Sequence, residues 1–568
     1  MNRSDLVKKT CALALATGLV AGGLSALGCS KEEKKAAVGV SGGTTAKSAA
    51  TDKVDLAATL VSRIPQDALG FLVWEGNHPA YAKLSASPWG SSTGITELLK
   101  NVEGDAKDLI ATLKNVGLDP AEKATWESIF SEAVFYFTAP AAGAKKPDLG
   151  VLFKSKDAGK LETLLATVKS EATKHNQKIG EAKLALGKGF TIAGPNAEAE
   201  LIVASDNGFG VISTSQALAE KTLGSKGGAT PTLLTTPAFL KASAGFPDAS
   251  KRFATGYLDV ERMVQEATKS GAKVDTSALE TFPLRAVALA FSMDETPATS
   301  MRFVYDDSKT PNNPWLKSLN SSASKSLTGV LPTKPLIVLS VDGKMIKDVK
   351  EALLAGLGEL GAAYRQQLAF LDDVKRIAIA ASVAPMGQSL LPIPDLMVVA
   401  ESANAEKTRA QLEGILGLAM MSSGMPGMAW QDKQIEGSAV KSMMSPMGVG
   451  LFLASSNGLV VATSSEPVMK AALGNKSGFS AALPKRGGEV FNETQTVSNL
   501  YLNFEEIGSY VESMGGMMAM YAPQGQDASK FLNPENIQAI KKMGSMVGAI
   551  TFDKGIIGVD SFYQQPAV

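Results

Sequence analysis

Short apolar runs alternate with stretches of helical periodicity along most of this chain. Runs rich in β-branched and aromatic residues, such as Val134–Phe137 and Ile377–Val383, predict strands. Apolar residues at helical spacing over Lys160–Glu171 and Glu406–Leu418 predict helices. The alternation of the two kinds of segment indicates a mixed fold of strands and helices.

One stretch of this pattern occurs twice. Leu201–Gly224 (LIVASDNGFGVISTSQALAEKTLG) and Leu451–Gly474 (LFLASSNGLVVATSSEPVMKAALG) are identical at nine of 24 aligned positions. In both, an Asn-Gly pair separates two apolar runs, which is typical of a two-residue hairpin turn. Strands joined by such turns are antiparallel. The pattern therefore predicts an α+β fold, in which helices pack on a largely antiparallel sheet.

Further matches follow in the same order in both halves. They pair Ile64-Pro65 with Leu331-Pro332, Pro147–Leu149 with Pro394–Leu396, and Tyr257–Glu261 with Tyr501–Glu505. These collinear matches predict two tandem copies of one α+β domain, residues 55–305 and 328–568. Residues 306–327, rich in Ser, Asn and Pro, form a predicted linker. The arrangement resembles a family of duplicated bacterial envelope proteins of unknown function, and that resemblance implies neither an activity nor site residues.

The first 28 residues have the pattern of an export signal. Arg3, Lys8 and Lys9 precede an apolar run over residues 10–28, and Cys29 follows it. The sequence Ala26-Leu27-Gly28-Cys29 resembles the end of a bacterial lipoprotein signal, although that family usually has Leu where Ala26 stands. The resemblance implies that residues 1–28 are removed and that Cys29 is lipidated. A retained membrane anchor and cleavage without lipid are the alternatives.

Residues 29–54 begin with the cysteine and continue as a small, polar segment without apolar periodicity. Such a segment predicts a flexible tether between a lipid anchor and the folded part. Ser30 follows Cys29, and no Asp is there to signal inner-membrane retention in the best-known sorting rule. The resemblance to lipoproteins therefore implies the cell envelope, with the outer membrane favoured.

Composition narrows the class of protein. Apolar residues make up 45% of the 568 and charged residues 20%, which is typical of folded domains. The formal net charge is 0, and it is −2 without residues 1–28, so nothing favours a nucleic-acid partner. The two cysteines both lie near the N-terminus, which excludes an internal disulfide framework in the mature chain.

The sequence holds no convincing catalytic motif. His78 and His175 are the only histidines, so neither a zinc site nor a Cys-His pair is expected. Ser205-Asp206-Asn207 and Lys476-Ser477-Gly478 resemble two motifs of serine β-lactamases and penicillin-binding enzymes. The Ser-x-x-Lys nucleophile that those enzymes need is absent between Cys29 and Ser205. We therefore interpret Ser205-Asp206-Asn207 as part of a hairpin and predict no enzyme and no cofactor.

Two pairs of equivalent residues have a structural and a functional interpretation. Asp148 and Asp395 each follow a proline, which favours a turn at the entry of a strand over a shared acidic site. Tyr257 and Tyr501 could stack on a ligand. The interpretation that we favour is that each packs on a half-buried strand, with its hydroxyl at the edge.

Methionine is unusually concentrated in the second half, where 13 of the 21 fall in three places, several as Met-x-x-Met. Eight of them are candidates to line an apolar groove: Met425, Met428, Met444, Met447, Met514, Met517, Met518 and Met520. Core packing is the first interpretation and an adaptable groove the second. Thioethers also bind Cu(I), but no histidine accompanies these clusters.

These observations together predict a non-enzymatic, membrane-anchored envelope lipoprotein. It would act as a binding or scaffolding module for a hydrophobic ligand or an envelope protein, without a cofactor, a metal or nucleic acid. The alternative is periplasmic copper(I) handling through the Met-x-x-Met clusters.

Overall fold

The structure is a computed structural model that divides into two compact units, residues 1–306 and 307–568. It describes residues 60–74, 79–80, 83, 130–140, 147–155, 157–174, 176–193, 200–225, 232–271, 283–308, 316, 326–356, 359–383, 394–422, 429–444, 450–474, 478–483, 485–521, 534–553 and 555–564. Cys29, the predicted signal and the predicted tether lie outside this set. Each unit is described separately.

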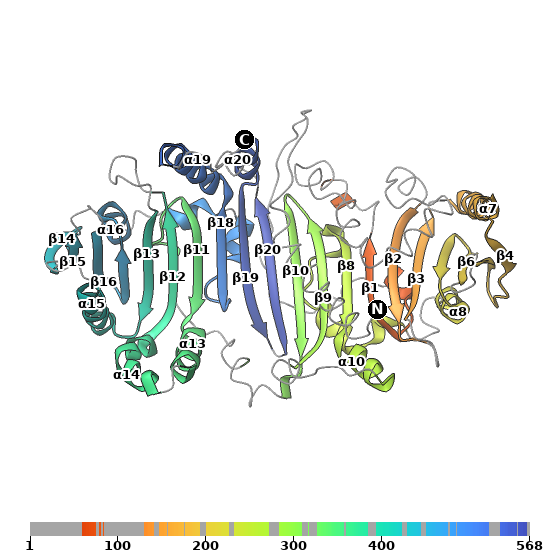
Figure 1. Cartoon of the computed structure of the whole chain (residues 1–568), viewed down its shortest axis with the longest axis horizontal. Helices are drawn as coiled ribbons and strands as arrows, with labels where there is room; N and C mark the ends of the chain where they lie inside the picture. The colour runs from red at the N-terminus through yellow and green to blue at the C-terminus, as the bar shows by residue number, and fades with distance from the viewer. Residues whose placement is uncertain are drawn as a thin grey trace. The chain divides into compact units, whose positions relative to one another are not determined.

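The described part of unit 1 contains ten strands, labelled in Figure 1 where there is room. They are β1 (Ala68–Trp74), β2 (Phe130–Thr138), β3 (Asp148–Ser155), β4 (Lys178–Glu181), β5 (Lys188–Ala193), β6 (Glu200–Asp206), β7 (Phe209–Ser213), β8 (Arg252–Asp259), β9 (Leu284–Met293) and β10 (Pro297–Tyr305). Their antiparallel pairings give the order β10-β9-β8-β1-β2-β3-β7-β6-β5-β4. The helices are η2 (Leu60–Arg63), α7 (Ala158–Lys174), α8 (Gln216–Gly224), η3 (Leu233–Thr235), α9 (Pro237–Ser243), η4 (Ala249–Lys251) and α10 (Val260–Lys269).

Helices cover both faces of this sheet. On one face, residues of α8 and α9 such as Leu218 and Phe239 join a core cluster with Val134 and Tyr136 of β2. On the other face, Leu161 and other residues of α7 pack against the outer strands β5, β6 and β7. Because successive strand residues point to opposite faces, a single strand such as β6 contributes to both clusters.

Unit 2 also contains ten strands among its described residues. They are β11 (Pro335–Asp342), β12 (Val374–Ser382), β13 (Asp395–Ser402), β14 (Gln431–Ile435), β15 (Ser438–Met444), β16 (Gly450–Ser456), β17 (Leu459–Thr463), β18 (Ser498–Asn503), β19 (Ser545–Asp553) and β20 (Ile556–Gln564). The antiparallel order is β20-β19-β18-β11-β12-β13-β17-β16-β15-β14. The helices are α13 (Gly343–Gly356), α14 (Glu359–Gln367), η6 (Leu368–Asp373), α15 (Ala405–Ser422), α16 (Glu466–Leu473), α17 (Phe479–Ala482), α18 (Lys485–Val490), α19 (Phe504–Tyr521) and α20 (Pro534–Lys542).

The predicted α+β class with a largely antiparallel sheet is confirmed. The strand and helix predictions are confirmed by β2, β12, α7 and α15, each within a few residues of the expected bounds. Corresponding strands pair in the same order in the sheets of the two units. That the two units superpose as copies of one domain stays a prediction. None of the helices within the described residues is both long enough and apolar enough to cross a membrane.

The Asn-Gly pairs form the predicted hairpin turns. Asn207 and Gly208 have φ values of 49° and 81° between β6 and β7, and Asn457 and Gly458 have 53° and 80° between β16 and β17. Positive φ at both central residues is the requirement of this turn type. Ser215 caps α8 through its side chain, which accepts from the backbone N–H of Leu218. Ser465 holds the same place before α16 without a side-chain cap bond.

We predict that Gly458→Ala lowers the free energy of unfolding by about 1 kcal/mol, because a Cβ disfavours the left-handed conformation. The added methyl group would meet only Ser402 O, at 4.0 Å, so the effect is conformational. Gly414→Ala is the matched control, because Gly414 lies inside α15 with open space around it. That change should raise stability by about 0.5–1 kcal/mol. Urea unfolding measures both, and equal signs would contradict the prediction.

Candidate functional site: an apolar sheet face in unit 2

Large aliphatic side chains stand exposed on the central strands of unit 2. Ile337 and Leu339 of β11 are each 38% exposed, Ile379 of β12 is 44% exposed and Leu396 of β13 is 53% exposed. Their neighbours along each strand, such as Val338, are buried. Since successive strand residues alternate between faces, one face of these strands is packed and the other is open.

The strand register brings these exposed residues together. Leu339 is paired with Ile379 across β11 and β12, and Ile379 with Val398 across β12 and β13. Ala381 stands between Ile337 and Leu396 in the adjacent row. We call the surface formed by Ile337, Leu339, Ile379 and Leu396 the apolar face. Single exposed apolar residues are common on proteins, but a contiguous group across three strands is typical of a binding surface.

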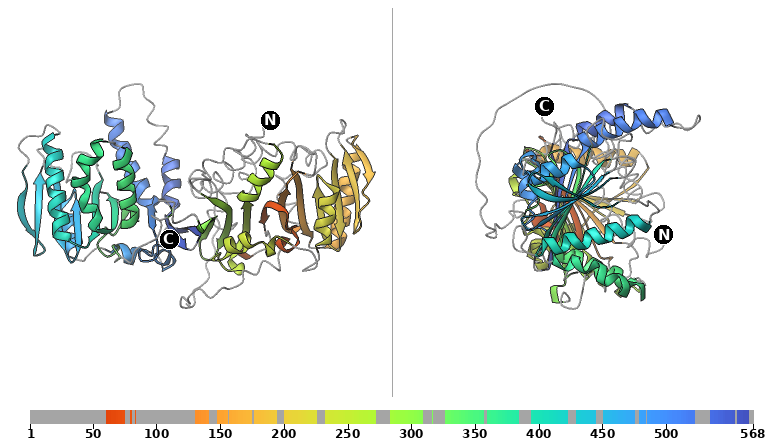
Figure 2. Two further views of the ribbon diagram at one scale, coloured as in Figure 1. Left: turned by 90° about the horizontal axis from the view of Figure 1, so that it is seen from below. Right: turned by 90° about the vertical axis from the view of Figure 1, so that its left-hand side faces the viewer.

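Helix α15 lies on the same side of the sheet as the apolar face. It packs on β16 and β17, where the Ser455 hydroxyl donates to the carboxylate of Glu406 at 2.5 Å. Figure 2 shows α15 and α19 projecting from one side of the sheet of unit 2. Helix α19 contacts β11 and β19, so the apolar face lies on strands between these two helices.

Unit 1 has a smaller version of this feature. Leu72 of β1 and Phe135 of β2 are register partners, and each is 38% exposed. They lie on the face that α7 covers farther along the sheet, where Val151 packs against the α7 cluster. Both units therefore expose paired apolar side chains on their central strands.

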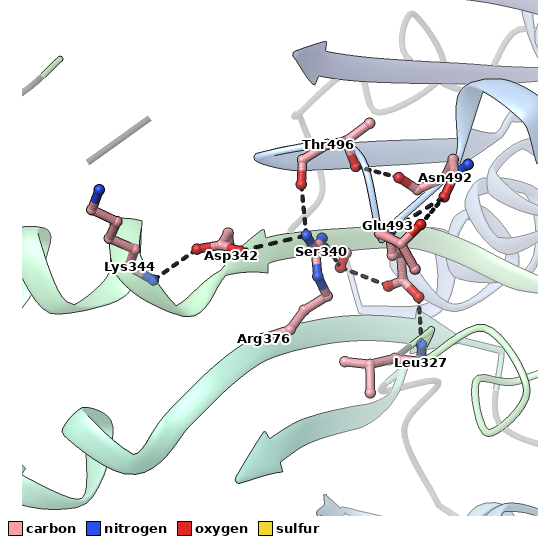
Figure 3. A network of polar contacts seen from close by, with 9 residues as sticks. Leu327, Ser340, Asp342, Lys344, Arg376, Asn492, Glu493 and Thr496 are labelled. Atoms are coloured by element: carbon pink, nitrogen blue, oxygen red, sulfur yellow. Dashed lines mark hydrogen bonds and ion pairs between the residues drawn. The ribbon is translucent and has the colours of Figure 1, made fainter. Parts of the chain in front are cut away.

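The opposite face of the same strands in unit 2 holds a buried charge network (Figure 3). Arg376 of β12 and Asp342 of β11 are both fully buried, with Nη2 and Oδ2 separated by 3.8 Å. The guanidinium also donates to Ser340 Oγ at 3.3 Å and to the carbonyl oxygen of Thr496 at 2.6 Å. Burial lowers the pKa of Arg376, and nearby carboxylates, that of Glu493 foremost, act against this change.

Glu493 is the second centre of the network and is 1% exposed. One carboxylate oxygen accepts from Ser340 Oγ at 2.7 Å. The other accepts from Ser326 Oγ at 2.9 Å and from the backbone N–H of Leu327. The carboxylate therefore connects the segment that contains Ser326 and Leu327 to the central strand β11. Every oxygen of Glu493 has a partner, which indicates a structural role rather than a ligand site.

The structure describes the side chains of only two of the eight methionines predicted to line a groove. Met444 of β15 is exposed and Met514 of α19 is half-buried. Met517, Met518 and Met520 belong to α19, but their side chains lie outside the described residues, as do Met425, Met428 and Met447 altogether. The methionine groove thus stays a prediction. Among the residues that the structure describes, no three His, Cys, Asp or Glu side chains gather as a metal site.

Ser205 occupies the end of β6, where its hydroxyl donates to a carboxylate oxygen of Glu162 at 3.0 Å. Ser455 makes the corresponding contact in unit 2. The catalytic-looking Ser-Asp-Asn string is therefore a strand end and a hairpin turn, as interpreted. Lys476 and Ser477 lie outside the described residues.

The two tyrosines are more deeply placed than expected. Tyr257 and Tyr501 are buried, not half-buried, and each ring meets a phenylalanine edge-on, Phe239 and Phe479 respectively. Burial raises the pKa of both phenols. The packing interpretation is confirmed, and the half-buried setting was wrong, because helices cover this face.

Asp148 and Asp395 open β3 and β13, as expected of strand-entry residues. The apolar face itself was not predicted from the sequence. Its signal was present in the run Leu336–Val341, which is apolar at positions that point to both faces. Such a run is normally taken to mean that both faces are covered.

We predict that Arg376→Met lowers the free energy of unfolding by about 3–5 kcal/mol, because it leaves buried carboxylates without their cation. The control is Arg365→Met, which removes an exposed ion pair to Glu351 at 2.6 Å. That change should cost less than about 1 kcal/mol. Chemical unfolding measures both, and a similar small loss in the two variants would show that the buried network contributes little.

Comparisons with known proteins add only a distant structural likeness. No protein-family model and no curated protein matches the chain. Among solved structures, crystal form III of TP0453 matches with 12% identity and a TM-score of 0.22, over 44% of this chain and 83% of that chain. Crystal form I of TP0453 has the same identity and TM-score, over 43% and 81% of the two chains. A likeness at this level carries no argument about fold or function.

Proposed function

We propose that this chain is a non-enzymatic lipoprotein of the cell envelope, anchored through a lipid on Cys29. The outer membrane is its favoured location. It acts as a binding module, and the apolar face of unit 2 contacts a hydrophobic ligand or an apolar surface of an envelope protein. The tether of residues 29–54 connects this module to the membrane. Neither a cofactor nor nucleic acid takes part.

The single observation that carries this proposal is the in-register group of exposed aliphatic side chains on β11, β12 and β13. Keeping such side chains in water forgoes about 25 cal/mol for each Å² of apolar surface that could be buried. A ligand or partner that covers the face recovers this free energy. Aliphatic side chains without polar groups suit acyl chains or apolar protein side chains, since neither needs hydrogen-bond partners.

Interactions on the opposite face of the sheet hold the strands of the apolar face in place. They are the Arg376 network and the packing of buried neighbours such as Val338 and Ala378. A surface that is rigid before binding loses little conformational entropy when a partner arrives. This support favours recognition by a preformed surface over one that orders on binding.

We predict that the full mature chain enhances the fluorescence of 1-anilinonaphthalene-8-sulfonate, and that Leu339→Thr with Ile379→Thr reduces the enhancement by half or more. Threonine is β-branched, which suits a strand, and it removes much of the apolar surface at both positions. Both positions are exposed, so the double variant should stay folded.

Leu240→Thr is the matched control, because Leu240 is 53% exposed on α9, which belongs to unit 1 and contributes no residue to the apolar face. It should leave the dye signal nearly unchanged. An equal loss in the control and in the double variant would refute a specific apolar face.

The anchor has its own test. We predict that Cys29→Ser moves the protein from the membrane fraction to the soluble fraction, or leaves an uncleaved precursor, because serine cannot form the thioether to the lipid. Mass spectrometry of the mature N-terminus checks this result. An unchanged mass and an unchanged fractionation would exclude lipidation at Cys29 without affecting the proposal for the apolar face.

A further inference from the structure

The apolar face of unit 2 belongs to a larger, regular array of aliphatic side chains. Each row of this array crosses β18, β11, β12 and β13 through register partners. One row consists of Leu502, Ile337, Ala381 and Leu396, and the other of Leu500, Leu339, Ile379 and Val398. All eight side chains are exposed or half-buried, and none is charged, polar or aromatic. The array therefore offers apolar contact without a hydrogen-bonding side chain.

The dimensions of the array follow from those of a β-sheet. Neighbouring strands are about 4.8 Å apart, so a row of four positions is about 14 Å long. The two rows are about 6.7 Å apart, because alternate residues of a strand repeat at that distance. One leaflet of the hydrocarbon core of a bilayer is about 15 Å thick, which is the reach of one lipid acyl tail. Each row thus matches one tail in length, and the two rows lie side by side as the tails of one lipid do.

The array is small for a protein partner. With the reach of its side chains it covers roughly 14 Å by 13 Å, or about 200 Å². A specific protein–protein interface covers about 800 Å² on each partner, so a protein or a second copy of this chain would need much additional surface. Helices α15 and α19 flank the strands of the array and project from the same side of the sheet (Figure 2). A narrow occupant therefore suits this place better than a broad one.

The part of the chain that precedes unit 1 leads towards a supply of acyl tails. The proposed anchor is on Cys29, and residues 29–54 follow it as a polar segment. A flexible segment of this length has a typical end-to-end distance of about 25–30 Å. A module held at such a distance stays close to the lipids of the bilayer that anchors it.

We propose, on the basis of the binding function above, that the apolar face binds one diacyl membrane lipid, with one acyl tail along each row. Acyl tails need no hydrogen-bond partners, so aliphatic side chains alone satisfy them. The polar headgroup stays in water. Burial of apolar surface on both the lipid and the array supplies the free energy of binding.

The test is lipid uptake by residues 29–568 carrying Cys29→Ser, a change that removes the chain's own acyl groups as competitors. Vesicles of phosphatidylcholine with a pyrene-labelled phosphatidylcholine are the probe, because excimer fluorescence falls when a labelled lipid leaves the vesicle. We expect uptake of a single lipid per chain. Leu339→Thr with Ile379→Thr should lower the affinity at least fivefold, since both changes fall in one row, and Leu240→Thr should leave it unchanged.

The number of tails gives an independent check. In competition with the labelled lipid, a lysophosphatidylcholine with the same tail should bind at least tenfold more weakly than the diacyl lipid, since it leaves one row uncovered. Equal affinities of the two lipids would overturn the assignment of one tail to each row.

The other outcomes distinguish the lipid from the binding function itself. If no lipid is taken up but the double variant still reduces the dye signal, the lipid is refuted and the apolar face remains a binding surface. If neither lipid nor dye binds, both proposals fail. Flotation with vesicles without lipid uptake would assign the face to a membrane surface instead. A dimer in native mass spectrometry that the double variant dissociates would assign it to a second copy.

Discussion

A fully buried guanidinium is the constraint on which the rest of unit 2 depends. Arg376 has no contact with water, so its charge is tolerable only while Asp342 and Glu493 stay close and the backbone of Thr496 accepts its hydrogen bond. These groups belong to β11, to β12 and to the segment that enters β18. Any arrangement that separated these segments would leave a charge uncompensated in the core. The network therefore selects one packing of the central strands.

The apolar face is the other side of that arrangement. Ser340 points to the network while Leu339 points outward, and Arg376 alternates in the same way with Ile377 and Ile379. Polar groups that would normally occupy the solvent side of such strands are thus inside, and aliphatic groups are outside. This inversion is stable because each buried charge is paired, and it leaves apolar surface for a partner to cover.

Local patterns in the sequence were enough to predict the antiparallel α+β class, the two hairpins and several strand positions. Asn457-Gly458 predicts its turn because the requirement for positive φ is satisfied within two residues. The charge network could not be predicted in this way, since Leu327, Arg376 and Glu493 are far apart in the sequence and meet only in the folded unit. The openness of the apolar face depends on which helices cover which strands, and a run such as Leu336–Val341 does not contain that information.

One end of each strand order, β4 in unit 1 and β14 in unit 2, bears on whether strands of other molecules can add to the sheet. Within the described residues, β4 and β14 each pair with one neighbour only. The backbone N–H and C=O groups on their outer sides could therefore hydrogen-bond to strands of other molecules. Both strands are short and largely exposed, with Lys178 and Glu181 on one and Asp432 and Lys433 on the other. An incoming strand would have to desolvate these charges. Each unit can thus expose apolar surface on a sheet face while charged side chains protect the edge at β4 or β14.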